Sequence, residues 1–297
     1  MILVKSNEKW PNFFIVGAPK AGTTSLYEYL KNINEIYFPK IKEPHYFSQT
    51  VVPENHYITP VRDKKEYLKL YENVDFKILG DASVYYLSDP ETPTLIHNVS
   101  PNARIIISLR DPVERVYSHH LMQTNNFWLQ TSFHDQLKKE MKHSIPFGKP
   151  SIRLEAGLYY ENVKRYLDIF GKSQVKILIF EEWIKNIEKT FQEILNFLGL
   201  TVSQIDFNDI PYNEYKTLGK ISKQILKSKR ISKIAKATLT KSQRDSLRNK
   251  LYRKGKKPNM DEMDRKLLID FYKDDVRKLE NLIGRKLPWK NFATEHS

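Results

Sequence analysis

Short apolar runs alternate with longer amphipathic stretches over most of this chain. Four mainly apolar runs have the length of strands buried in a parallel sheet, and they span residues 13–17, 76–83, 103–111 and 175–183. The runs at 76–83 and 103–111 end in polar residues. Apolar residues recur at helical spacing between and after these runs, at residues 23–33, 112–125, 152–171, 187–199 and 260–284. This alternation predicts an α/β fold with a central parallel β-sheet flanked by helices.

Capping residues mark several of the expected helix ends. Pro112 fits the first turn of the helix at 112–125, and Asp111 stands before it as a cap. Glycine stands where later helices should end, at Gly171, Gly199 and Gly284.

Composition indicates one globular unit, because 297 residues with 40% hydrophobic content can bury a large core. We expect residues 1–297 to form a single domain. Cysteine is absent, which excludes disulfides, thiolate metal sites and cysteine nucleophiles. Lys5, Glu8 and Lys9 interrupt the only apolar start, so no signal peptide is visible, and the longest apolar runs are too short to span a bilayer. The expectation is a cytoplasmic protein without an integral membrane segment.

The net charge of +14 is concentrated near the C-terminus. Residues 216–257 hold 16 Lys and Arg and one acid, which leaves 33 basic and 34 acidic residues in the remainder of the chain. Within this segment, residues 221–240 predict a basic amphipathic helix and residues 253–261 a loop. Such a basic segment indicates an anionic partner, which could be a phosphorylated cofactor, an acidic glycan, a membrane surface or nucleic acid. The alternative interpretation is a solvent-exposed helix face without a partner.

The loop after the first expected strand is close to a phosphate-binding P-loop. Gly17 and Gly22 are separated by four residues, and three hydroxyl residues at 23–25 open the next helix. Backbone N–H groups near Gly22 and the N-terminus of that helix favour an oxyanion here. The lysine is displaced, however, because Lys20 precedes the second glycine, whereas a nucleotide-triphosphate loop places its lysine directly after it.

The displaced lysine changes the chemistry that this loop supports. Metal-dependent phosphoryl transfer needs a carboxylate for magnesium, and Asp111 suits a helix cap better than that role. A sulfuryl group carries less charge than a terminal phosphoryl group, so Lys20 can serve as the only electrophilic partner at the leaving phosphate. The loop therefore favours sulfuryl transfer without a metal over ATP hydrolysis.

Two motifs resemble those of sulfotransferases that use 3′-phosphoadenosine 5′-phosphosulfate (PAPS) and release adenosine 3′,5′-bisphosphate. GAPKAGTTSLYEYL at 17–30 resembles their 5′-phosphosulfate loop, and RIIISLRDPVERVYSHH at 104–120 resembles their 3′-phosphate motif. The resemblance implies that Arg110 and Ser118 grip the 3′-phosphate, in line with the bidentate geometry of a guanidinium. It also implies a set of loop residues that bind the cofactor, namely Lys20, Ala21, Gly22, Thr23, Thr24 and Ser25.

The resemblance extends to Trp289 and is closest to the heparan-sulfate-type and related bacterial glycan sulfotransferases. RKGKKPNMD at 253–261 resembles the loop that closes over the cofactor in that group, and FYKDDVRKLENLIGRKLPW resembles its C-terminal helix. The residues that the resemblance places over the cofactor are Lys254, Gly255 and Lys256. The fold it implies is a single P-loop-like domain.

A candidate general base lies in the stretch IKEPHYF at residues 41–47. Either Glu43 or His45 could accept a proton, since burial and neighbouring charges can bring a glutamate pKa toward neutrality and a histidine starts near it. The resemblance implies Glu43 as the base with His45 in support. A surface turn around Pro44 is the alternative interpretation.

One position departs from the family pattern. Many glycan sulfotransferases carry a second lysine near the transferred group, whereas this chain has Asp81 and Ala82 there. Either Lys42 supplies the second cation, or the enzyme works with Lys20 alone.

The predicted function is PAPS-dependent transfer of a sulfuryl group to a hydroxyl or amine. A P-loop kinase or NTPase is the alternative among enzymes, and a basic nucleic-acid-binding or membrane-binding protein is a distant third, so we expect no nucleic-acid partner. The acceptor expected first is a polysaccharide or glycolipid, and a small hydroxylated metabolite comes second.

Overall fold

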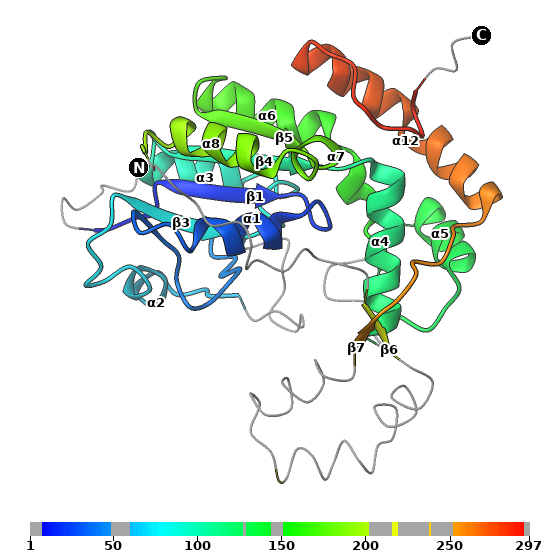
Figure 1. Cartoon of the computed structure of the whole chain (residues 1–297), viewed down its shortest axis with the longest axis horizontal. Coiled ribbons are helices and arrows are strands. Elements are labelled where there is room, and N and C mark those ends of the chain that lie inside the picture. The colour runs from blue at the N-terminus through cyan, green and yellow to red at the C-terminus, as the bar shows by residue number, and fades with distance from the viewer. Residues whose placement is uncertain are drawn as a thin grey trace.

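A five-stranded parallel sheet lies at the centre of the molecule, in the strand order β2-β3-β1-β4-β5 (Figure 1). The structure, a computed structural model, describes residues 8–48, 60–126, 129–143, 151–201, 216–218, 238 and 252–293. The strands of the sheet are β1 (Phe13–Gly17), β2 (Ile36–Tyr37), β3 (Ile78–Ala82), β4 (Arg104–Leu109) and β5 (Val175–Ile179). The predicted α/β fold with a central parallel sheet is confirmed.

Helices cover both faces of this sheet (Figure 1). The helices of the described ranges are α1 (Thr23–Leu30), α2 (Lys64–Lys69), α3 (Thr92–Val99), α4 (Pro112–Asn125), α5 (Phe133–Lys142), α6 (Tyr160–Phe170), α7 (Phe180–Trp183), α8 (Ile187–Phe197) and α12 (Glu262–Ile283), with a 3-10 turn η1 at Leu154–Gly157. Alternate residues of β1 enter two different cores, as the side-chain period of a strand requires. Phe13 and Ile15 pack with α1 and α8, whereas Phe14 and Val16 pack with α4, α6 and α12.

The start of α4 forms as the sequence predicts. Pro112 is in its first turn, and the Asp111 carboxylate accepts hydrogen bonds from the amides of Val113, at 2.9 Å, and Glu114, at 3.4 Å. This cap fixes the direction in which the chain leaves β4, and so it fixes where Arg110 lies.

The predicted helix at 152–171 is wrong in its first half. Arg153 has φ 53°, the short turn η1 follows it, and α6 begins only at Tyr160. The carboxylate of Asp275, on α12, accepts hydrogen bonds from the amides of Tyr159 and Tyr160 at 2.7 and 3.2 Å. These bonds satisfy N–H groups at the helix start, so a partner distant in the sequence places that start.

Two further boundaries differ from the prediction. The run at 175–183 is a strand only to Ile179, after which residues 180–183 turn into α7. The expected loop at 253–261 begins as a strand, because β7 (Tyr252–Lys254) pairs antiparallel with β6 (Lys216–Leu218). Apart from residue 238, the helix predicted at 221–240 lies outside the described residues.

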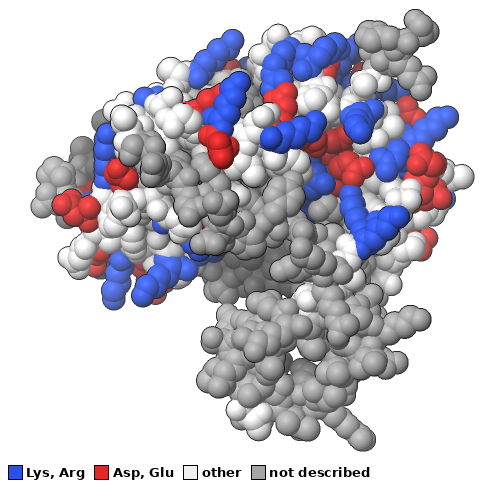
Figure 2. Space-filling model, viewed as in Figure 1, with Lys and Arg blue, Asp and Glu red and all other residues white. Residues whose placement is uncertain are grey.

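Surface charge is mixed over the described part of the face in Figure 2, where Lys and Arg lie among Asp and Glu. None of the helices in the described ranges combines the length and the apolar character needed to cross a bilayer.

Candidate active site

The turn from β1 into α1 presents backbone N–H groups that no side chain caps. Gly22 is the N-cap of α1, has φ 82° and makes no side-chain cap hydrogen bond. Residues 23–25 form the first turn of the helix, and the hydroxyl residues Thr23 and Ser25 are buried in it. An uncapped helix N-terminus with a glycine before it is a site for an oxyanion.

Packing behind the loop leaves no room for a side chain at position 22. A Cβ on Gly22 would lie 2.3 Å from the Cζ2 atom of Trp183 and 2.8 Å from the Phe180 ring. Ser108, in β4, donates a hydrogen bond to the carbonyl of Ala21 at 2.6 Å and accepts one from the Trp183 indole at 3.2 Å. Sequence analysis missed this support, although Ser108 is the one polar residue inside the apolar run IIISL.

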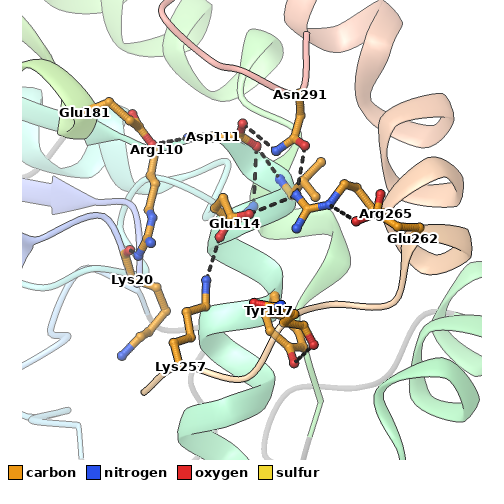
Figure 3. A network of polar contacts seen from close by, with 12 residues as sticks. Lys20, Arg110, Asp111, Glu114, Tyr117, Glu181, Lys257, Glu262, Arg265 and Asn291 are labelled. Atoms are coloured by element: carbon orange, nitrogen blue, oxygen red, sulfur yellow. Dashed lines mark hydrogen bonds and ion pairs between the residues drawn. The ribbon is translucent and has the colours of Figure 1, made fainter. Parts of the chain in front are cut away.

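Lys20 lies in the loop between β1 and α1, with its backbone at φ 70°. Its carbonyl accepts a hydrogen bond from Arg110 at 3.1 Å (Figure 3). Its Nζ lies 3.6 Å from the sulfur of Met122. Burial, followed by repulsion from Arg110, lowers the pKa of Lys20 to about 8. An anion between the two side chains would relieve that repulsion.

Arg110 leaves the end of β4 with part of its guanidinium free to bind. Its guanidinium carbon lies 4.7 Å from the centre of the Phe180 ring. Its buried Nε has no hydrogen-bond partner within the described ranges, which points to a ligand acceptor. Ser118, the other residue implied at the 3′-phosphate, is half-buried on α4.

The segment around Glu43 lies against the start of α1. Lys42 Nζ donates to Glu43 Oε1 at 2.8 Å and to Thr24 Oγ1 at 3.2 Å, so it links the base candidate to the oxyanion loop. His45 Nε2 lies 3.3 Å from the other oxygen of Glu43. The structure thus places the stretch that holds Lys42, Glu43 and His45 beside the oxyanion loop, although the two motifs are separate in the sequence.

His45 is fully buried, so the alternative of a surface turn at this segment is wrong. Glu43 has φ 61° and His45 has φ 52°, both in the left-handed region. Each such residue costs about 1–3 kcal/mol, and the surrounding contacts must hold it in place.

The pKa of Glu43 moves in the direction opposite to the one considered from the sequence. Burial raises it, but contact with His45 and the nearby Lys42 outweigh burial and lower it to about 2. Glu43 is therefore ionised throughout the neutral range. Such a carboxylate is already in the form that accepts a proton, and the same contacts that keep it ionised make it a weaker base than a glutamate with an ordinary pKa.

Asp81, at the position where the resemblance implies a second lysine, is fully buried. Its carboxylate accepts hydrogen bonds from Tyr67, Ser83 and Tyr86, at 2.7, 2.7 and 2.9 Å. Its position is therefore structural, and Lys42 is the second lysine that the structure places beside the loop.

A polar network fastens the chain after β7 to α4 (Figure 3). Glu114 accepts from Lys257 at 2.5 Å and from Arg265 at 3.0 Å. Asn291 joins the network by accepting from Arg265 at 2.9 Å and donating to the Asp111 carboxylate at 2.8 Å. Asp111 is thus committed to helix capping and to Asn291, in agreement with its predicted role.

The residues implied to close over the cofactor lie at the edge of this network. Lys254 is in β7, Gly255 follows it half-buried, and Lys256 is exposed. The next residue, Lys257, makes the contact with α4, which sequence analysis did not single out. Among the described residues, no group of three or more His, Asp or Glu side chains is arranged to hold a metal ion.

Comparisons with known proteins point to one family. The family model for the sulfotransferase domain matches residues 11–282. The crystal structure of a sulfotransferase from Alicyclobacillus acidocaldarius is 30% identical, with 94% of this chain and 98% of that chain covered at a TM-score of 0.71.

Two curated relatives are longer than this chain. Human carbohydrate sulfotransferase 15 is 28% identical over 246 residues, which cover 64% of this chain and 44% of that protein. Mouse bifunctional heparan sulfate N-deacetylase/N-sulfotransferase 4 is 24% identical, with 96% of this chain and 31% of that protein covered. The chain spans less than half the length of either relative.

Proposed function

Because this chain belongs to the sulfotransferase family, we propose that it transfers a sulfuryl group from PAPS to a hydroxyl or amine of a glycan-type acceptor. The observation that carries the proposal is the grouping of two cations and a carboxylate, Lys20, Lys42 and Glu43, around the uncapped start of α1. This grouping supplies both a cation for a leaving phosphate and an ionised base.

The residues present fit PAPS. Residues 20–25 would hold the 5′-phosphosulfate through backbone N–H groups, hydroxyls and the Lys20 ammonium. Arg110 and Ser118 would hold the 3′-phosphate, and the free Nε of Arg110 is a donor suited to it. When bound, PAPS supplies the sulfuryl group, whose bond to the phosphate oxygen breaks as a bond to the acceptor oxygen or nitrogen forms.

Lys20 would stabilise the charge that develops on the phosphate oxygen during transfer, as preorganised donors do in other group transfers. Glu43 would take the proton of the acceptor, and His45 and Lys42 would orient its carboxylate. We propose Lys42, which contacts Thr24, as the second cation near the transferred group, in place of the lysine that the resemblance implies at the position of Asp81.

Lys254, Gly255 and Lys256 would lie over the bound cofactor. The contact between Lys257 and Glu114 supports this role, because it fastens the following residue to the helix that carries Ser118.

The acceptor is inferred from the kinds of relative that the chain matches. A carbohydrate sulfotransferase and a heparan sulfate N-sulfotransferase are both named for glycans. We therefore place a polysaccharide or glycolipid before a small hydroxylated metabolite as the acceptor.

Two measurements test the proposal. Adenosine 3′,5′-bisphosphate should bind tightly to the purified protein and ATP weakly, and the reverse ranking would favour a kinase. Radiolabelled PAPS should then transfer its label to at least one member of a panel of glycans, phenols and lipid alcohols. If every acceptor in the panel gives no more label than a reaction without acceptor, the result would count against the proposed acceptor class.

A further inference from the structure

We propose that Asp81 is a positioning residue, which holds the segment that carries the base in its active shape through two hydroxyl relays. The segment is residues 43–47, called the base loop below. The inference rests on the proposed function, because the position of this loop matters to catalysis only if Glu43 is the base.

Asp81 lies at the end of β3 and is fully buried. Burial raises the pKa of Asp81 above its usual value, and hydrogen bonds from Ser83, Tyr67 and Tyr86 offset only part of that rise. A buried carboxylate needs such donors, since an unpaired charge at this depth would be costly. Asp81 therefore fixes the direction of three hydroxyl groups.

Two of those hydroxyls reach the backbone of the base loop. Ser83 Oγ donates to Asp81 at 2.7 Å and accepts from the amide of His45 at 3.1 Å. The Tyr86 hydroxyl donates to Asp81 at 2.9 Å and accepts from the amide of Phe47 at 3.3 Å. A hydroxyl that donates to a carboxylate becomes a better acceptor, so the charge of Asp81 strengthens both bonds to the loop.

The base loop needs such support, because Glu43 and His45 both have left-handed backbone angles. Non-glycine residues keep this conformation only where the surroundings impose it. The two relays hold the loop at the amides of His45 and Phe47, two and four residues after the base. Loss of either hydrogen bond should let Glu43 move away from Lys42 and the oxyanion loop.

Tyr67 provides a matched control for this idea. Its hydroxyl donates to Asp81 at 2.7 Å, as the Tyr86 hydroxyl does at 2.9 Å, and both tyrosines are buried. In the described part of the chain, the Tyr67 hydroxyl makes no hydrogen bond to an amide of the base loop. Tyr67→Phe and Tyr86→Phe thus remove the same group from the same carboxylate, but only the second change breaks a relay.

The experiment measures loop protection and turnover in these variants. Amide hydrogen exchange of a peptide spanning residues 43–47, read by mass spectrometry, should become about tenfold faster in Tyr86→Phe and Ser83→Ala. The same two variants should lose about tenfold in kcat, measured with PAPS and a glycan that accepts label in the panel described above, because small displacements of a base are costly. Their affinity for adenosine 3′,5′-bisphosphate should stay within about twofold of wild type.

Three controls separate positioning from general destabilisation. Tyr67→Phe should leave exchange and kcat within about twofold of wild type, and Ser83→Thr should restore what Ser83→Ala loses. In a Glu43→Gln background, Tyr86→Phe should cause no further loss of kcat, because its effect acts through the base.

Equal effects of Tyr67→Phe and Tyr86→Phe, or a full additional loss in the Glu43→Gln background, would overturn the proposal. If the wild-type protein transfers no label from PAPS, the proposed function fails instead. The exchange measurement then still decides whether Asp81 holds the base loop, so the two failures are distinguishable.

Discussion

The lowered pKa of Lys20 leads to a prediction about the pH dependence of turnover. The perturbation is a rise in pH from 7 to 9 at constant ionic strength, and kcat/KM for PAPS is the quantity measured, because it reports the ionisations of the free enzyme. Lys20 acts as an ammonium, and burial together with Arg110 lowers its pKa to about 8. Activity should therefore be present below that pH and be lost as the proton leaves above it.

The magnitude follows from the titration of a single group. With a pKa of about 8, Lys20 is about 90% protonated at pH 7 and about 10% protonated at pH 9, so kcat/KM should fall about tenfold. Lys20→Arg is the matched control: its guanidinium keeps its charge at pH 9, so the residual activity of this variant should lack the fall. A wild-type profile that stays flat to pH 9, or the same fall in Lys20→Arg, would refute the reasoning.

The remaining predictions concern the other parts of the site. Arg110→Ala and Ser118→Ala should weaken binding of adenosine 3′,5′-bisphosphate, by calorimetry, far more than binding of adenosine 5′-phosphosulfate; equal losses for both would contradict the assignment to the 3′-phosphate. Glu43→Gln should lower kcat by about 100- to 10,000-fold with PAPS affinity retained, and His45→Ala should be milder; the reverse ranking would make the histidine the base. Gly22→Ala should lower the melting temperature and abolish nucleotide binding, because its Cβ would lie 2.3 Å from an indole carbon and φ is 82°; a stable variant that binds normally would refute the packing described for the loop.

The sheet could be predicted from the sequence because its central strands are short, mainly apolar runs. Parallel strands buried on both faces need such runs: β1 is entirely apolar, and Ser108 is the one polar residue in β4 after Arg104. The oxyanion loop and the cap at Asp111 were equally visible, since both depend on residues adjacent in the chain.

Features that depend on distant partners were not predictable in this way. The first half of the helix expected at 152–171 is absent because Asp275, on α12, caps the amides at the start of α6. The low pKa of Glu43 likewise depends on how closely His45 and Lys42 approach it, and neither distance follows from spacing in the chain. The Asp81 relays join segments that lie 38 and 39 residues apart in the chain, and the local sequence pattern does not predict such a contact.

Metal-independent transfer that requires Lys20 is the central claim, and one measurement tests it most directly. Radiolabelled PAPS and a glycan acceptor from the panel described above are incubated with wild type and with Lys20→Ala, each in excess EDTA, and label in the glycan is counted. Wild type should transfer label undiminished by EDTA, and Lys20→Ala should be about 100- to 1000-fold slower while remaining folded by circular dichroism. Equal transfer by the two proteins, or transfer by wild type that EDTA abolishes, would contradict the account.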